Sequence, residues 1–154
     1  MILFQARRFV FPRVSHDDVL NNARFEFRYE DRNWESGLTT TFSVDAAGHV
    51  EYRPERVMQV HQNGGGVAMS RGLGDVRFTA TPEHVRLLRE AVANNQFFDL
   101  DDSYVDRSIH DGANATFSAR VGEHTKSVHC SNLFPPEIIA IRNLIRAHLL
   151  TPPR

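Results

Sequence analysis

The chain has 154 residues, of which 41% are apolar and 24% are charged, a composition that is ordinary for one globular domain with a core of its own. Its 18 lysines and arginines are balanced by 19 aspartates and glutamates, and no run of like charge exceeds two residues. A protein that follows a phosphate backbone needs a basic stripe. We therefore expect no nucleic acid partner.

The single cysteine, Cys130, excludes an intrachain disulfide and a zinc site built from several cysteines, and it favours a reducing compartment. No segment reaches the length of a membrane span. The first eight residues place their charges after a short apolar stretch, which is the reverse of a signal peptide. We expect a cytoplasmic protein without membrane contact, and a secreted or periplasmic location stays open.

The first third of the chain alternates apolar and polar residues, the period of a strand with one face in the core and one in water. Residues 23–32 show this alternation most clearly. Residues 38–44 and 50–52 flank the turn sequence Asp45-Ala46-Ala47-Gly48, which predicts a hairpin. Before these strands, Ser15 is placed to cap a short helix that ends near Leu20.

Two glycine clusters, Gly64-Gly65-Gly66 and Gly72-Leu73-Gly74, lie among further strand candidates. These candidates are residues 7–11, 57–61, 67–70 and 75–79. A phosphate-binding loop does not fit, because no Gly-Lys-Ser/Thr follows and a strand rather than a helix comes next. We interpret the glycines as turns or a flap, and Gly64, Gly65, Gly66 and Arg71 as candidates for partner binding.

The second half of the chain predicts a helix, a hairpin and a second helix. Thr81 is placed to cap an amphipathic helix that ends at Asn95, and Pro136 opens another that ends near Leu150. Between them, residues 113–121 and 124–130 flank the two-residue turn Gly122-Glu123.

The short turn also predicts the register of this hairpin. Val121 then pairs with His124 and Ala115 with Cys130. Cys130 lies on the apolar face and His129 on the polar face, so the two cannot form one dyad or bind one ion.

Together these elements predict a single α+β domain over residues 1–154, with a mainly antiparallel sheet of about five to seven strands and two helices on one face. Residues 38–150 are the expected α+β core. Residues 1–37 are either an N-terminal extension or extra strands of the sheet.

The phrase Phe97-Phe98-Asp99-Leu100 leads to Tyr104 between the first helix and the hairpin. With the strand pair at residues 39–52 before it and the Pro-led helix after it, this phrase resembles a family of small bacterial domains of unknown function. The resemblance covers about Leu38 to Leu150 and implies the same α+β fold. Proteins of that family are often secreted or lipid-anchored, whereas this chain shows no lipobox.

The order of elements is also similar to that of emfourin-type protein inhibitors of thermolysin-like metallopeptidases. In those inhibitors a Gly-Gly-aromatic-Ala-Gly phrase precedes the helix. Here Gly65-Gly66-Val67-Ala68-Met69 lacks both the aromatic residue and the closing glycine. This similarity therefore implies a fold and assigns an inhibitory role to no residue.

Eight histidines are the obvious candidates for catalysis or metal binding. His110 and Asp111 precede the hairpin close to several aspartates, and His129 lies on its polar face; such groups can bind a divalent ion. They give one hypothesis, a small metal-dependent hydrolase. The spacing matches neither a calcium loop nor a Gly-x-Ser-x-Gly nucleophile, and we expect no cofactor.

Trp34 stands among polar turn residues at a hairpin tip, between the strands predicted at residues 23–32 and 38–44. It is either a lid on the core, the commoner fate of a large aromatic residue, or an exposed anchor for a partner. No set of catalytic groups reaches a recognisable spacing. Our leading hypothesis is a non-enzymatic protein-binding module, such as an inhibitor or an accessory subunit; its partner is another protein, and a homo-oligomer stays open.

Overall fold

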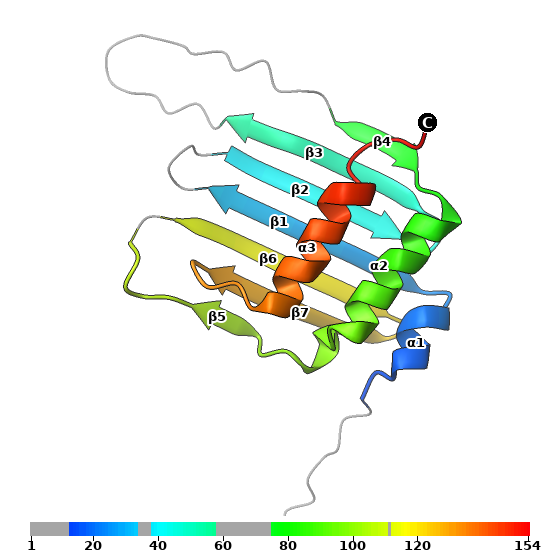
Figure 1. Cartoon of the computed structure of the whole chain (residues 1–154), viewed down its shortest axis with the longest axis horizontal. Helices are drawn as coiled ribbons and strands as arrows, with labels where there is room; N and C mark the ends of the chain where they lie inside the picture. Colours follow the sequence, from blue (N-terminus) through cyan, green and yellow to red (C-terminus); the bar gives the residue numbers. More distant parts are fainter. Residues whose placement is uncertain (1–12, 34–37, 58–74, 111) are drawn as a thin grey trace, which may run out of the picture.

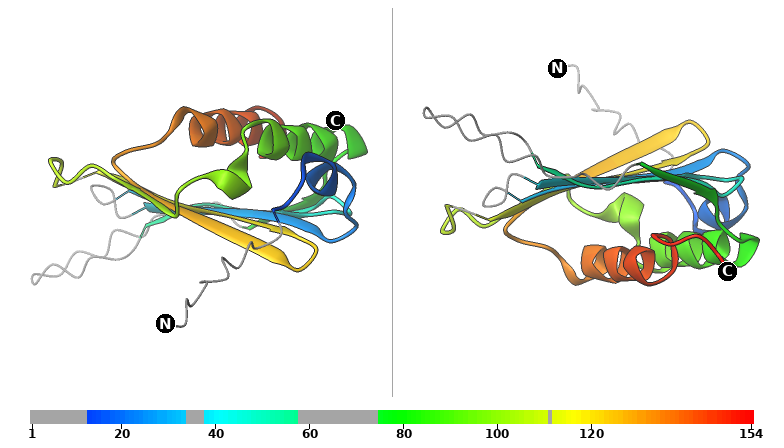
Figure 2. Two further views of the ribbon diagram at one scale, coloured as in Figure 1. Left: turned by 90° about the horizontal axis from the view of Figure 1, so that it is seen from below. Right: turned by 90° about the horizontal axis from the view of Figure 1, so that it is seen from above.

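The computed structural model describes residues 13–33, 38–57, 75–110 and 112–154. These residues form a seven-stranded sheet with helices on one of its faces (Figure 1 and Figure 2). The strands are β1 (Phe25–Asn33), β2 (Leu38–Asp45), β3 (His49–Val57), β4 (Val76–Thr79), β5 (Ser103–Val105), β6 (Ala113–Val121) and β7 (His124–Ser131). The helices are α1 (His16–Asn21), α2 (Pro82–Asn94), α3 (Pro136–His148) and the 3-10 turn η1 (Phe97–Asp99). The prediction of a single α+β domain is confirmed.

The sheet has the strand order β4-β3-β2-β1-β6-β7-β5. Neighbouring strands are antiparallel except β5 and β7, which run parallel. β1 lies in the middle and pairs with both β2 and β6, so it joins the first predicted hairpin to the second. The segment before residue 38 therefore supplies the central strand of the sheet.

The core lies between the sheet and the two long helices. Phe27, Phe42 and Phe117 come from three adjacent strands and are almost completely buried. The ring of Tyr29 lies between two of them, 5.6 Å from Phe42 and 5.7 Å from Phe117, and such aromatic contacts stabilise a core beyond simple burial. The helix residues that cover these rings are Val85, Leu88, Val92, Ile138, Ile141, Ile145 and Leu149.

Both predicted hairpins are confirmed. The β2–β3 turn contains Gly48 at φ +86°, where an added Cβ would lie 2.8 Å from the carbonyl oxygen of Ala80, so glycine is required there. The β6–β7 hairpin has the predicted register, with Ala115 opposite Cys130. As a result Cys130 is fully buried, whereas its neighbour His129 is exposed.

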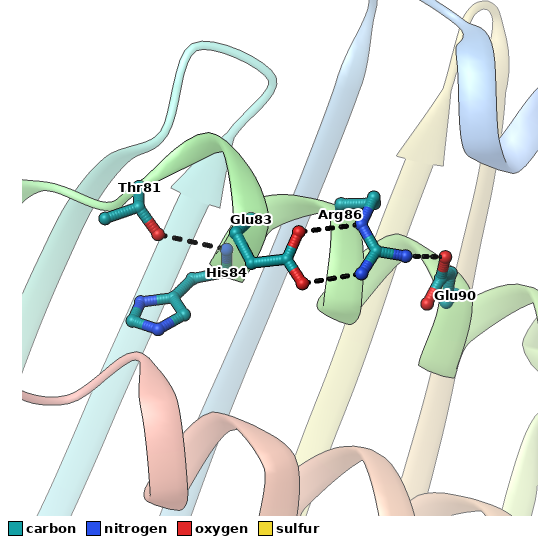
Figure 3. Close-up of polar contacts among 5 residues, drawn as sticks. All are labelled: Thr81, Glu83, His84, Arg86 and Glu90. Atoms are coloured by element: carbon teal, nitrogen blue, oxygen red, sulfur yellow. Dashed lines mark hydrogen bonds and ion pairs between the residues drawn. The ribbon is translucent and has the colours of Figure 1, made fainter.

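The predicted start of α2 is also confirmed. Thr81 Oγ1 accepts a hydrogen bond from the backbone amide of His84 at 3.2 Å (Figure 3), which satisfies a free N–H of the first turn. On the outer side of the helix, Arg86 forms ion pairs with Glu83 and Glu90 (Figure 3).

Helix α1 has the predicted cap, in which the side chains of Ser15 and Asp18 bond to each other's backbone amides. Its other end is held by Arg89 of α2. Arg89 Nη1 donates to the carbonyl oxygens of Val19, Leu20 and Asn22 at 3.0, 3.2 and 3.0 Å. A cation at the C-terminus of a helix is favourable, so one side chain joins α1 to the helix layer.

Strand β5 has no counterpart among the predicted strands. It is three residues long and shows no clear alternation, and it is defined by its parallel pairing with β7. No described helix is long and apolar enough to cross a membrane.

Candidate functional site

One face of the sheet is covered by α2 and α3, and no described helix covers the other face (Figure 2). We call the uncovered side the open face. Antiparallel sheets commonly present one face to water, and the side chains on the central strands here are all polar or charged. They are Glu26, Arg28, Glu30 and Arg32 on β1, Thr39, Thr41, Ser43 and Asp45 on β2, Glu51 and Arg53 on β3, and Asn114, Thr116, Ser118 and Arg120 on β6.

Eight of these side chains form two rows across β3, β2, β1 and β6. In the first row, the register partners are Glu51, Ser43, Arg28 and Ser118. In the second row, they are Arg53, Thr41, Glu30 and Thr116. We call these eight residues the charge array. All of them line one hollow of about 510 Å³ on the open face.

Opposite charges alternate in both directions across the charge array. Along β3, Glu51 is followed on the same face by Arg53, and along β1, Arg28 is followed by Glu30. Across the strands, Glu51 shares a row with Arg28, and Arg53 shares a row with Glu30, with the hydroxyl groups of β2 between them. The array therefore offers both signs of charge and a set of hydroxyl groups, rather than a field of one sign.

Ion pairs position the guanidinium groups at the β3 side of the array. Arg53 Nη2 lies 3.1 Å from Glu51 Oε1, and Arg53 Nε lies 3.4 Å from Asp75 Oδ2. Arg77 on β4 reaches the same Glu51 oxygen at 3.0 Å. Hydrogen bonds from Arg77 and Arg53 lower the pKa of Glu51, so this carboxylate stays ionised. Ion pairs this accessible to solvent contribute little stability, so exchanging them for contacts with a ligand costs little.

A second hollow, of about 490 Å³, adjoins the first on the side of β4 and shares Ser43 and Glu51 with it. Its far end is lined by Asp45 and His49, whose Oδ2 and Nδ1 atoms lie 2.9 Å apart. Partial burial acts to raise the pKa of Asp45, but hydrogen bonds from His49 and Ala47 outweigh it and the pKa falls. The second hollow is also lined by Val44, Val50 and Phe78, so it is less polar than the hollow over the charge array.

Several residues that the sequence predicts for binding or metal coordination lie outside the described residues. They are Trp34, Gly64, Gly65, Gly66, Arg71 and Asp111. The described strand ends beside them are paired, Asn33 with Ala113 and Leu38 with Val57. The end of β1, the start of β2, the end of β3 and the start of β6 therefore lie at the same end of the sheet.

The remaining candidates of the hydrolase hypothesis lie on different segments. His129 is exposed on the open face, and its Nδ1 lies 3.3 Å from the hydroxyl of Thr116 in the charge array. His110 is exposed in the connection between β5 and β6. Among the residues that the structure describes, no three His, Cys, Asp or Glu side chains are grouped to hold a metal ion. Cys130 lies in the core, where burial raises its pKa to about 11.

The charge array itself was not among the sequence predictions, although its strands were. The alternation at residues 26–30 indicates that Glu26, Arg28 and Glu30 point to solvent. It does not show which strands lie beside them, because the β1–β6 pairing joins residues about 90 positions apart in the chain. Only this pairing places Arg28 next to Ser118.

Comparison with models of known protein families finds no match. Comparison with curated proteins finds none either. The resemblance to small bacterial domains of unknown function and to emfourin-type inhibitors therefore stays a prediction.

Proposed function

We propose that this chain is a non-enzymatic protein-binding module, acting as an inhibitor or accessory subunit, and that the charge array is its docking surface. The observation that carries the proposal is the hollow over the array, which is lined by both signs of charge and by hydroxyl groups. Protein interfaces combine about one hydrogen bond per 100–200 Å² with charges that match those of the partner. The array supplies donors, acceptors and charges in that form.

The partner we propose is a protein segment that carries both acidic and basic side chains. Arg28 and Arg53 are placed to bind its carboxylates, since guanidinium groups bind carboxylates in a planar, bidentate way. Glu30 and Glu51 are placed to bind its cations. A polyanion such as nucleic acid would meet two carboxylates on the same surface and is disfavoured.

The alternating pattern favours specificity over affinity. Arg28 is already paired with Glu26, and Arg53 with Glu51, so a partner replaces exposed intramolecular ion pairs by intermolecular ones. Such an exchange gains little net energy at a solvated rim but penalises a partner whose charges are out of register.

Site-directed photo-cross-linking tests the proposal. A benzophenone amino acid in place of Ser118 lies in the array, whereas the same residue in place of Asn143 lies on the exposed side of α3 and serves as the matched control. We expect the Ser118 probe, and not the Asn143 probe, to capture a protein from native lysate. The captured protein is then purified and its binding to the unmodified chain is measured directly.

The double substitution Glu51→Arg/Arg53→Glu tests the pattern itself. It preserves the net charge and the pairing between positions 51 and 53 but inverts the order of charges on β3 and sets like charges against Arg77 and Asp75, so an unchanged thermal midpoint is required of the variant. We expect it to weaken binding of the purified partner by about tenfold or more. Equal binding by this variant, or equal capture by the Asn143 probe, would refute docking on the array.

The hydrolase hypothesis makes a separate prediction. If His110, Asp111 and His129 bind a catalytic metal ion, elemental analysis of the purified chain will find a stoichiometric transition metal that is lost in His110→Ala. Metal-free protein that still binds its partner would favour the binding module.

A further inference from the structure

Three segments at the β5 edge of the sheet carry exposed apolar residues, and we call these residues, Val105, Ile109 and Leu133, the apolar cluster. Among the described residues, the large hydrophobic side chains with the greatest exposure are Val105 at 43%, Ile109 at 46%, Leu133 at 46% and Ile139 at 37%. Val105 ends β5, Ile109 follows it, and Leu133 follows β7, so three of the four come from segments that meet at Asn132. Clustered exposed apolar residues mark interaction sites more often than scattered ones do.

Asn132 fixes the segments that carry this cluster. It has φ +60°, and its backbone N–H donates to the carbonyl oxygen of Ala113 at 2.9 Å. Its Nδ2 donates to the carbonyl oxygen of Ile109 at 3.1 Å, and its backbone forms a β-bridge with Val105. Gly112 packs so closely that an added Cβ would lie 1.9 Å from Asn132 Oδ1. The backbone of the segments that carry the apolar cluster is therefore held in place by Asn132.

The backbone beside the cluster is the edge of the sheet. β5 is the last strand of the described sheet, and it pairs with β7 and, through Val105, with Asn132. The amide of His129 donates to the carbonyl of Asp102, and the amide of Asp106 donates to the carbonyl of Ser131. Because backbone groups alternate in direction along a strand, those of Ser103 and Val105 point away from β7.

The two faces of β5 differ in chemistry. Val105 is paired with Ser131 and so lies on the open face. Asp102, one residue before β5, has the opposite parity and forms an ion pair on the side of the helices with Lys126, which lies opposite the buried Ala119. Hydrogen bonds from Ser108 lower the pKa of Asp106, which keeps it ionised. Residues 101–107 carry three aspartates and one arginine, and Lys126 pairs with one of these aspartates, so acidic groups exceed basic groups by one at this edge.

We propose that the β5 edge binds an extended segment of a partner protein in which apolar and basic residues alternate. The segment adds antiparallel to β5, its backbone bonding to Ser103 and Val105. Its apolar side chains then lie on the open face beside Val105, and its basic side chains lie on the helix side near Asp102. This is recognition by strand addition, in which backbone bonds give affinity and alternate side chains give specificity. A second copy of this chain fits poorly, because two acidic edges would repel each other.

The test measures binding of short synthetic peptides to the full chain by fluorescence anisotropy. The probe is a blocked peptide of alternating lysine and valine, and the control is a peptide of alternating glutamate and valine. We expect the lysine peptide to bind at least about tenfold more tightly. N-methylation of its valines should weaken binding by about tenfold or more, because those amides face β5, whereas N-methylation of its lysines should have little effect.

Variants of the chain locate the site. We expect Val105→Asp and Leu133→Asp each to weaken binding of the lysine peptide by about tenfold, and Ile139→Asp on α3 to leave it within about twofold. All three positions are exposed, and an unchanged thermal midpoint confirms that each variant folds. Val105→Ser, a milder change, is the second variant if Val105→Asp is unstable.

Three results would overturn the inference. They are equal binding of the glutamate and lysine peptides, unchanged binding after N-methylation of the valines of the lysine peptide, and unchanged binding of the lysine peptide by Val105→Asp. A concentration-dependent dimer that Val105→Asp dissociates would show that a second copy occupies the edge instead. The β5 edge and the charge array are separate surfaces. We therefore expect Glu51→Arg/Arg53→Glu to leave peptide binding unchanged. Loss of peptide binding in that variant would place the peptide on the array and refute strand addition at β5.

Discussion

The helix-covered face and the open face are built from alternate residues of the same strands, yet they are chemically opposite. Along β1, Phe27 and Tyr29 are buried under the helices, while Arg28 and Glu30 lie on the open face. Every completely buried side chain of the described strands is apolar. The fold therefore depends on the helix-covered face. The open face tolerates substitution, because changes there remove little buried surface.

The substitution with the largest expected effect on stability is Phe27→Ala, because Phe27 lies on the helix-covered face of the central strand β1. Phe27 is completely buried and its ring lies 5.6 Å from that of Phe97. Removing a buried phenylalanine costs about 3–5 kcal/mol of the free energy of unfolding. Urea denaturation should show this loss, while Arg28→Ala, one residue along on the open face, should leave the curve nearly unchanged. Similar losses for both variants would contradict the separation of the two faces.

Arg89→Met extends the comparison to two arginines of the same helix. Arg89 donates three hydrogen bonds to the end of α1, and its guanidinium lies 4.5 Å from the centre of the Phe25 ring. Losing bonds from a charged donor should cost about 1.5–3 kcal/mol, measured by urea denaturation. Arg86→Met removes an exposed arginine whose ion pairs stay within α2 and should change stability little. Equal effects would show that the contact with α1 is not stabilising.

Thr81→Ala should have a smaller effect, about 1 kcal/mol, because it removes the side-chain oxygen that caps α2. The matched control is Thr79→Ala, two residues earlier on the exposed side of edge strand β4. Thermal denaturation followed by circular dichroism should resolve the first change and not the second. An equal loss of stability in Thr79→Ala would contradict the prediction, because it would show that the loss does not come from the helix cap.

Titration of Cys130 is expected to change the free energy of unfolding only at alkaline pH, so at neutral pH it has the smallest effect of all. Burial raises its pKa to about 11 from an ordinary value near 9, so the folded chain holds this proton more tightly than the unfolded chain does. Stability from this group is therefore complete below pH 9 and is lost as the pH rises toward 11. Urea denaturation between pH 8 and 11 should show a steeper decline for the natural chain than for Cys130→Ala. Parallel declines would contradict the raised pKa.

Much of the fold could be predicted from local patterns. The alternation at residues 23–32, the turn at Gly48 and the cap at Thr81 each depend on near neighbours in the chain, and the structure confirms all three. The register of the β6–β7 hairpin was predictable for the same reason, since a two-residue turn leaves one pairing. By contrast, the parallel β5 has too few residues to carry a pattern.

The candidate sites were much less predictable. The predictions from sequence concentrated on rare residue types, such as Trp34 and the histidines, because each of these can be recognised without knowing its neighbours in space. The charge array uses common residues, and its meaning comes from their neighbours on other strands. The segments of the apolar cluster likewise meet only in the fold, where Val105 bridges Asn132 across 27 positions of the chain.

The sequence by itself therefore determined the alternation of β1, the turns of both hairpins, the starts of the helices and the placement of Cys130 and His129 on opposite faces of β7. These follow from backbone geometry over a few residues, where spacing dictates direction. Only the tertiary structure decided that β1 lies at the centre between β2 and β6, and that β5 forms an edge. Such pairings depend on the burial of apolar surface contributed by the whole chain, and they place the charge array and the β5 edge on the surface.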